Sequence, residues 1–253
     1  MRGTQSIERA VALLKELSAR GTFGWRLSDL AAHCNLDKGT AHRILNCLQR
    51  ERLVQQRERD RHYLPGPLLF ELSLTLPPLA EFQAACQAPL GRVARRTRGV
   101  AFLYLRSGGD FVCAAREGTT PLKGLSIHVG TRRPLVSSSG GVAILLALPE
   151  EESRRIIAEN MKRLARFGEL RAKSIEKMIR RSREHGFGIN LGDVVPGIHS
   201  FGIAIQDAKG APFASLTVSG ASADFPPSEV PKVMALLEEE GVQIGKRMPL
   251  SAI

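Results

Sequence analysis

A run of small polar residues, Ser137-Ser138-Ser139-Gly140-Gly141, directly precedes the apolar stretch Val142–Leu148. The apolar stretch predicts a buried helix, and the first N–H groups of a helix have no intrahelical partner. A helix N-terminus of this kind favours an anion. The run therefore indicates a carboxylate site formed by the backbone of Ser139, Gly140 and Gly141, although a plain helix cap with glycines for close packing explains the same spacing.

The same serines could instead serve a small-molecule-metabolising enzyme as an anion or oxyanion site. The chain has no G-x-S-x-G elbow, no lysine three residues after Ser137, Ser138 or Ser139, and no H-E-x-x-H motif. Its six histidines show no metal-ligand spacing. We therefore expect no catalytic residue, cofactor or metal, and keep the enzyme as the alternative.

A second group of polar residues follows Asp37, which can cap a helix. Lys38, Thr40, His42 and Arg43 fall on its outward face. The inward positions are apolar: Ala41, Ile44, Leu45 and Leu48. A recognition helix reads base edges with residue types of this kind near its N-terminal end. The pattern predicts DNA binding, and an ordinary solvated helix face is the alternative.

The residues around that helix predict a winged helix-turn-helix. Helices are expected over Ser6–Arg20, with Ser6 as N-cap, and from Ser28, as N-cap, to Asn35. The second is joined to the Asp37 helix by a tight turn. A charged hairpin follows, and its Arg57, Arg59 and Arg61 suit phosphate or minor-groove contacts as well as they suit any exposed hairpin.

Beyond the hairpin, the segment Pro65–Leu76 is too apolar for a flexible linker and predicts a connecting helix that forms an oligomer contact. Pro77-Pro78 is expected to stop it. The rest predicts an α+β domain of strands and helices. Helices are expected near 80–98, 138–148, 150–166, 173–185 and 228–247, and strands near 100–106, 111–116, 125, 187–191, 200–206 and 213–218.

The charge balance of the chain limits the classes of partner that we expect. Thirty-six Lys and Arg against 25 Asp and Glu leave a net charge of +11, which favours a partner that carries phosphates. No stretch is long and apolar enough to span a membrane, and charged residues interrupt the N-terminus where a signal peptide needs an apolar core. The four cysteines form no paired motif. We expect a cytoplasmic protein with reduced thiols and no membrane partner.

At several places the sequence resembles the IclR-type bacterial transcription regulators. In the first part the similarity rests on 5–10 (QSIERA), 27–31 (LSDLA), 38–45 (KGTAHRIL) and 63–67 (YLPGP). In the second part it rests on 129–135 (VGTRRPL), 145–149 (LLALP), 186–188 (GFG), 196–198 (PGI) and 214–220 (ASLTVSG). The two sets occur in order along almost the whole chain.

The resemblance implies three regions: a winged helix-turn-helix over 1–65, a linker helix over 66–78 and a GAF-like effector-binding domain over 79–253. It implies a homodimer or homotetramer that binds double-stranded operator DNA, with affinity modulated by a small organic acid from a catabolic pathway. The expected DNA-binding residues are Arg9, Ser28, Lys38, Thr40, His42, Arg43, Arg59 and Arg61.

The same resemblance assigns effector contacts. They are Leu122, Leu125, Ser139, Gly140, Gly141, Asn190, Ser200, Thr217 and Ser219. Some relatives that bind keto acids carry Asp and Cys where this chain has Asn190 and Ser200. We therefore expect an aromatic or hydroxylated carboxylate rather than glyoxylate or pyruvate.

Overall fold

A computed structural model describes residues 4–165 and 168–247. The chain divides into two compact units, residues 1–77 with 130–132 and residues 78–129 with 133–253. Within the described part of the chain, no helix is long and apolar enough to cross a membrane.

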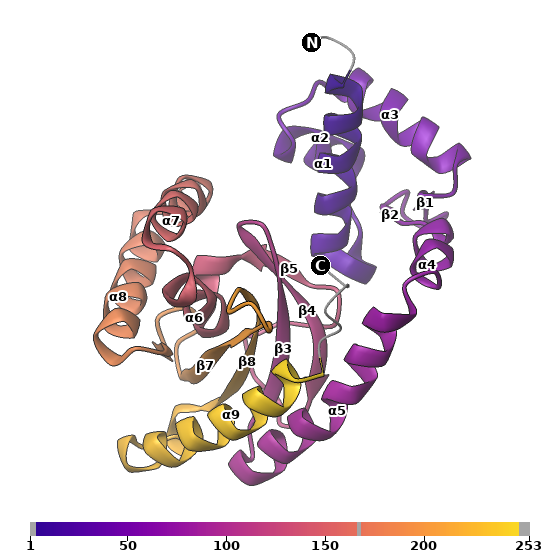
Figure 1. The fold of residues 1–253 in the computed structure, drawn as a ribbon. Helices are drawn as coiled ribbons and strands as arrows, with labels where there is room; N and C mark the ends of the chain where they lie inside the picture. The colour runs from indigo at the N-terminus through magenta and orange to yellow at the C-terminus, as the bar shows by residue number, and fades with distance from the viewer. Residues whose placement is uncertain (1–3, 166–167, 248–253) are drawn as a thin grey trace. The chain divides into compact units, whose positions relative to one another are not determined.

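The first unit is built from four α-helices, a 3-10 turn and a two-stranded hairpin (Figure 1). In chain order they are α1 (Gln5–Arg20), η1 (Gly21–Phe23), α2 (Leu27–His33), α3 (Lys38–Arg50), β1 (Val54–Gln56), β2 (Tyr63–Pro65) and α4 (Pro67–Ser73). β1 and β2 pair antiparallel, with Gln55 opposite Leu64. This is the predicted winged helix-turn-helix.

Trp25 connects the helices of this unit to the hairpin. Its backbone forms an isolated bridge with Tyr63, and its indole N–H donates to the carbonyl of Glu16, 2.8 Å away. The guanidinium of Arg20 lies 3.8 Å from the centre of the indole ring. Leu13, Leu17, Leu30 and Leu45, all fully buried, complete the core.

Two of the predicted helix caps were wrong and one was right. α1 begins at Gln5 and α2 at Leu27, so Ser6 and Ser28 lie inside their helices rather than at the N-cap. The hydroxyl of Ser28 instead lies 3.2 Å from the neighbouring Asp29 carboxylate. Asp37 does cap α3, because its carboxylate accepts the Thr40 N–H at 2.8 Å.

The second unit is a six-stranded sheet with helices on both faces (Figure 1). Its strands are β3 (Val100–Ser107), β4 (Asp110–Glu117), β5 (Arg132–Pro134), β6 (Gly188–Leu191), β7 (Ile198–Gln206) and β8 (Pro212–Ala221). Its longer helices are α5 (Pro77–Thr97), α6 (Ser139–Ala147), α7 (Glu150–Leu164), α8 (Glu169–His185) and α9 (Val230–Gly245). Short 3-10 turns lie at Leu135–Ser137, Ser222–Asp224 and Pro227–Glu229.

The strand order is β5-β4-β3-β8-β7-β6. The first three strands of this unit, β3 to β5, form one half of the sheet, and β6 to β8 form the other. The central pair, β3 and β8, joins the two halves. Side chains alternate between the faces of a strand. On β3, Ala101 and Leu103 pack in the cluster formed with α5 and α9. Phe102 and Tyr104 pack in the cluster formed with α6, α7 and α8. The sheet therefore has two separate apolar layers.

Prolines and one strand account for the largest differences from the prediction. Pro77 and Pro78 begin α5 rather than only ending the previous helix, because proline suits the first helical turn. Pro89 lies inside α5 and cannot bond the carbonyl of Ala85, which accepts from the Arg247 guanidinium at 2.6 Å instead. The strand expected near Leu125 was wrong: residues 118–131 form no strand, and β5 begins at Arg132.

Candidate functional site

The N-terminal turn of α3 presents polar side chains to solvent. Lys38, His42 and Arg43 are exposed, and Thr40 is half-buried. The Arg43 guanidinium donates to the Thr40 hydroxyl at 3.2 Å. Hydrogen bonds from Thr40 hold the pKa of Asp37 below its usual value, so the cap is a carboxylate at neutral pH. This cap fixes where α3 begins.

The turn between α2 and α3 sets the angle between these two helices. Asn35 adopts a left-handed conformation with φ 52°, which asparagine tolerates better than most residues. The N–H of Leu36 bonds the carbonyl of Ala31 at 2.9 Å and closes the end of α2. The predicted tight turn is therefore closed by its own backbone.

A cleft of about 420 Å³ lies between α2, α3 and the hairpin. Four of the predicted DNA-binding residues line it: Ser28, Lys38, His42 and Arg61. Arg26 and Gln56 line it as well, and sequence reasoning missed both. The signal for Arg26 was its position directly before a helix start.

The other four predicted residues do not line the cleft. Thr40 and Arg43 lie elsewhere on α3, and Arg59 projects from the hairpin tip with 77% of its side chain exposed. Arg9 is half-buried on α1. The structure thus brings half of the set together in one concave surface.

Arg57 differs from its neighbours in the hairpin because it is bound within it. Its guanidinium donates to both carboxylate oxygens of Asp60, at 2.9 and 2.7 Å, and to the carbonyl of Phe23 at 3.0 Å. The bond from Arg57 holds the pKa of Asp60 far below its usual value. Arg57 therefore shapes the hairpin, and Arg61, with φ 58°, completes its turn.

The second unit contains a cavity of about 20 Å³ between α6 and the sheet. It is lined by Tyr104, Leu125, Ile127, Ser137, Ser138, Ser139, Asn190, Val194, Val195, Ile198, Ser200, Thr217 and Ser219. Six of the nine predicted effector residues are in this set. None of the residues that line this cavity is Lys, Arg, His, Asp or Glu.

α6 lies on the sheet at backbone distance because glycines face it. A Cβ on Gly188 would lie 1.9 Å from the carbonyl oxygen of Ser139, and one on Gly202 would lie 2.9 Å from the N atom of Gly140. A Cβ on Gly140 itself would lie 2.1 Å from the Thr217 hydroxyl. The first turn of α6 is therefore placed directly on the hydroxyl-bearing face of β8.

The predicted anion site at this helix end is smaller than expected. Ser138 caps α6 by accepting the Gly141 N–H at 2.9 Å, so Gly141 has no N–H left for a ligand. Gly141 also packs on Leu135, where a Cβ would meet the carbonyl oxygen at 2.0 Å. Of the three predicted N–H groups, those of Ser139 and Gly140 stand at the free end of the helix.

The buried hydroxyls around α6 fall into two groups. Ser200 and Ser219 lie opposite each other on β7 and β8 and share a hydrogen bond of 2.9 Å. The hydroxyls of Ser139, Ser215 and Thr217 are buried without a hydrogen-bond partner among the described residues. Burying a hydroxyl without a partner costs free energy. Such groups are typical of a site that a ligand completes.

Asn190 is held in place by the loop that follows it. Its side-chain oxygen accepts the N–H groups of Asp193 and Val194, at 2.8 and 3.3 Å, so only its amide nitrogen can serve a ligand. Arg181 binds the Asp193 carboxylate at 2.7 Å. Burial raises the pKa of Asp193, but the bonds from Arg181 and from the Leu191 N–H lower that pKa by more. Asp193 and Arg181 therefore form a charged pair.

Three predicted effector residues do not line the cavity: Leu122, Gly140 and Gly141. Leu122 packs on the apolar layer around Tyr104. Tyr104, Ile127, Val194, Val195 and Ile198 line the cavity and were missed. Burial raises the pKa of the Tyr104 hydroxyl, so Tyr104 is uncharged. These residues come together at the cavity through the strand register and the paths of the loops, which the sequence alone does not show.

Family models match both units. The IclR helix-turn-helix domain matches residues 6–58, and the bacterial transcriptional regulator IclR C-terminal domain matches residues 80–246. The chain belongs to the IclR family of bacterial transcriptional regulators. Of the predictions from resemblance, this family assignment and the fold class are confirmed.

Curated relatives of this IclR-family chain are transcription regulators. It is 27% identical over 220 residues to the glycerol operon regulatory protein of Streptomyces coelicolor, covering 87% of this chain and 86% of that one. It is 24% identical to the HTH-type transcriptional repressor AllR of Salmonella typhi, covering 87% and 80%. The relatives thus have regulatory rather than enzymatic names.

Solved structures of the family share the fold. A putative IclR transcriptional regulator from Silicibacter sp. TM1040 aligns with a TM-score of 0.76 at 18% identity, covering 96% of both chains. An IclR homologue from Microbacterium hydrocarbonoxydans, complexed with 4-hydroxybenzoate, aligns with a TM-score of 0.66 at 18% identity, covering 96% of this chain and 99% of that one.

Proposed function

We propose that this regulator binds operator DNA through α3 and the hairpin, and that a small organic acid bound beside α6 changes its DNA affinity. It acts in the cytoplasm as a homo-oligomer and controls a catabolic operon. The observation that carries the proposal is the cluster of buried hydroxyls without partners at the N-terminus of α6, in a chain whose family regulates transcription.

The DNA half of the proposal rests on the cleft in the first unit. Lys38, His42, Arg26 and Arg61 supply positively charged or hydrogen-bonding groups around it. Residues 1–77 carry 12 Lys and Arg against 8 Asp and Glu, which attracts phosphates before any base is read. Arg43 and Thr40, already bonded to each other, lie on the same exposed side of α3 and can reach base edges.

The DNA test is a titration of labelled duplex selected from a random pool by the parent protein. We expect Lys38→Ala to weaken binding by about tenfold and to reduce the dependence of log affinity on log salt by about one phosphate contact. Arg50→Ala is the matched control, because Arg50 is exposed at the far end of α3. Equal loss in both variants would contradict placement at the N-terminal turn.

The acid half of the proposal rests on neutral groups. The N–H group of Ser139 lies at the positive end of the helix dipole, and the Thr217 and Ser139 hydroxyls can donate to the same carboxylate. Leu125, Ile127 and Tyr104 give the cavity an apolar wall. A relative crystallised with 4-hydroxybenzoate supports an aromatic or hydroxylated carboxylate as the ligand class.

Binding requires the cavity to open, because about 20 Å³ admits roughly one water molecule. One side of the cavity is formed by residues from two irregular segments, 118–129 and 192–197. They meet where a Cβ on Gly124 would lie 3.0 Å from Val195. We propose that an acid separates these segments, and that this movement alters DNA affinity.

The acid test is calorimetry with a panel of aromatic and hydroxylated carboxylates, followed by DNA titration with the best one. Thr217→Val keeps the shape of the side chain and removes its hydroxyl. We expect it to weaken acid binding by about tenfold, a usual effect of one lost hydrogen bond to a charged group. Thr4→Val, at the exposed N-cap position of α1 in the first unit, is the control. Unchanged binding in Thr217→Val would move the site elsewhere.

The oligomer contact is proposed for α4 and the residues after it. Leu69, Phe70, Leu72, Leu74 and Leu76 are exposed, and Phe70 presents 67% of its surface. So many apolar side chains on a short segment are typical of a protein interface. Phe70→Ser should halve the mass measured by light scattering at micromolar concentration. A parent protein that is monomeric under those conditions would contradict the proposal.

A further inference from the structure

Of the described residues that line the buried cavity, only Asn190 has a side chain whose donor and acceptor ends are different atoms. The other polar side chains there are hydroxyls of serine, threonine and tyrosine, and a hydroxyl can either donate or accept a hydrogen bond. An amide ends in an oxygen that only accepts and a nitrogen that only donates. The atom of the amide that faces the cavity therefore decides which kind of ligand group can bind beside it.

The loop after β6 determines which end of the amide faces the cavity. The side-chain oxygen of Asn190 accepts the backbone N–H groups of Asp193 and Val194, at 2.8 and 3.3 Å. Turning the amide over would place its nitrogen, a donor, against these two donors. Asn190 is buried, and its nitrogen makes no hydrogen bond to any described residue. A ligand therefore meets a donor at this position.

Helix α8 fixes the chain on both sides of Asn190. The hydroxyl of Ser182, a fully buried residue, accepts the N–H of Ile189 at 3.0 Å, directly before Asn190. The neighbouring residue of the helix, Arg181, donates to both carboxylate oxygens of Asp193, at 2.7 and 3.1 Å. Two consecutive residues of α8 thus hold the strand before Asn190 and the loop after it.

The ion pair between Arg181 and Asp193 is sheltered from water. Only 14% of the Arg181 side chain and 6% of the Asp193 side chain are exposed. The same carboxylate accepts the Leu191 N–H at 3.0 Å. Removing one partner of a buried pair leaves the other charge uncompensated. The position of Asp193, and of the N–H that it donates to Asn190, therefore depends on Arg181.

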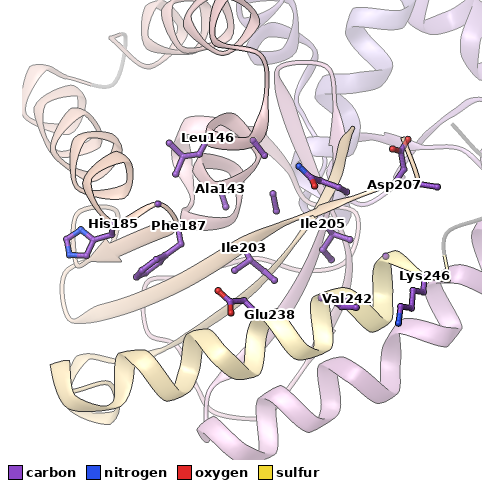
Figure 2. Close-up of a pocket in the computed structure, with 17 residues that line it drawn as sticks. Ala143, Leu146, His185, Phe187, Ile203, Ile205, Asp207, Glu238, Val242 and Lys246 are labelled. Atoms are coloured by element: carbon purple, nitrogen blue, oxygen red, sulfur yellow. The ribbon is translucent and has the colours of Figure 1, made fainter. Parts of the chain in front are cut away.

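The C-terminal end of α8 gives this ion pair a fixed base. The Nδ1 atom of His185 lies 2.9 Å from the carbonyl oxygen of Arg181. The His185 ring packs edge-on against Phe187, with 5.9 Å between the ring centres, and both residues line an open groove beside α8 (Figure 2). Met178 and Ile179 are buried in the apolar layer that α8 shares with α6. The guanidinium of Arg181 therefore extends from a backbone that is held on several sides.

We propose that Arg181 is a positioning residue that selects the effector. Through Asp193 it keeps the amide nitrogen of Asn190 directed at the ligand. The acid that binds must then carry, besides its carboxylate, a hydrogen-bond acceptor such as an ether or carbonyl oxygen that meets this nitrogen. An acid with an N–H at that place would set donor against donor and is rejected. The inference rests on the proposed acid site and adds its specificity.

The probes for the test are two acids of nearly the same shape, 4-methoxybenzoate and 4-(methylamino)benzoate, with their 3-substituted isomers. The ether oxygen only accepts, whereas the amine N–H donates and the nitrogen lone pair is delocalised into the ring. In calorimetry the parent should bind the ether about tenfold more tightly than the amine in at least one isomer pair, the effect of one hydrogen bond. The ratio of the two affinities is the readout, because a general change in the cavity affects both acids alike.

The Arg181 variants separate positioning from a general structural role. Arg181→Gln should abolish the preference for the ether, since Asp193 loses its cation and the Asn190 amide is free to turn. Arg181→Lys keeps the charge and should keep most of the preference. Arg180→Gln is the matched control, because Arg180 is the exposed neighbour on the same helix. An Arg181→Gln protein that binds both acids more weakly with the parent ratio would overturn the proposal.

A substitution of Asn190 tests the same point with the ion pair intact. In Asn190→Asp one carboxylate oxygen can still accept from Asp193 and Val194, and the other presents an acceptor to the ligand. The preference should reverse in favour of the amine, while the added negative charge weakens both acids and cancels in the ratio. An ether preference that survives in Asn190→Asp would overturn the proposal.

The parent protein distinguishes failure of this inference from failure of the acid site. If it binds neither probe, or both equally, selection through Arg181 is wrong. The acid site itself still stands if other aromatic or hydroxylated carboxylates bind the parent and Thr217→Val weakens them. A parent that binds no carboxylate at all contradicts both proposals.

Discussion

The two candidate sites offer opposite means of binding the negatively charged groups proposed for them. The cleft in the first unit is open and is lined by exposed, charged side chains such as Lys38 and Arg61. The cavity in the second unit is buried and is lined by hydroxyl, amide and apolar groups without a formal charge. DNA supplies many phosphates, so exposed cations suffice there. A small acid supplies one carboxylate, which needs fixed neutral donors in a dry site.

This difference predicts different responses to salt and to packing. Exposed charges are screened by salt, whereas buried dipoles are screened much less. Exposed side chains tolerate substitution, but the cavity depends on contacts between backbones. Substitutions in the two units should therefore separate DNA affinity from acid affinity and from stability.

The largest effect is expected at the close approach of α6 to β6. Gly188→Ala would place a Cβ 1.9 Å from the Ser139 carbonyl oxygen, and two backbones would have to separate. We expect the second unit to lose about 3 kcal/mol or more of unfolding free energy, measured by urea denaturation. Gly91→Ala in α5 meets only the Arg95 guanidinium and should be neutral or stabilising by up to about 1 kcal/mol. Equal stability of the two variants would disprove the packing argument.

The next largest effect is expected on DNA affinity alone. Arg43→Ala should cost about 1 to 3 kcal/mol of specific binding if Arg43 reads a base. Anisotropy titrations against selected and scrambled duplexes measure it, with Arg50→Ala as the matched control. Acid binding by the same variant should be unchanged. A loss equal for both duplexes would make Arg43 a phosphate contact instead.

A smaller effect separates the two kinds of buried hydroxyl. Ser200→Ala leaves Ser219 without its partner and should destabilise the second unit by about 1 to 2 kcal/mol. Ser215→Ala removes a hydroxyl that has no partner among the described residues and should be neutral or stabilising by about 1 kcal/mol. Both are measured by denaturation in the absence of acid. The comparison fails if Ser215→Ala costs as much as Ser200→Ala.

The smallest effect is a pH dependence in the first unit. The folded-state pKa of Asp37 lies below the value of the unfolded chain because Thr40 bonds the carboxylate. Its stabilising contribution is complete above the unfolded pKa and is lost as pH falls through the folded one. Asp37→Asn can still cap α3 but does not titrate. Thermal melting is measured between pH 3 and 7. The melting temperature should fall less steeply with falling pH in Asp37→Asn than in the parent.

The sequence was most informative where structure depends on neighbours along the chain. The Asp37 cap, the spacing of Leu45 and Leu48, and the charged hairpin are local signals, and they predicted the DNA-binding fold. The N-cap residues of α1 and α2 were predicted wrongly. Several residues near the start of each helix are able to cap it, and in the structure neither N-cap residue does so with its side chain.

The cavity was less predictable because its residues meet only through the sheet. Ser200 and Ser219 face each other through the β7–β8 register, and Tyr104 reaches the cavity from β3. Val194 and Val195 come from a loop whose path depends on Asn190 and Asp193. Gly141 was assigned to the ligand although a plain helix cap explained the same spacing, and in the structure Ser138 occupies its N–H.

Trp25 makes the two units separately observable. It is the only tryptophan of the chain, and it is buried between α1 and the hairpin. Its emission therefore reports on the first unit without any contribution from the second. A change in tryptophan emission on adding an acid to the unmodified protein would be direct spectroscopic evidence that the second unit communicates with the first.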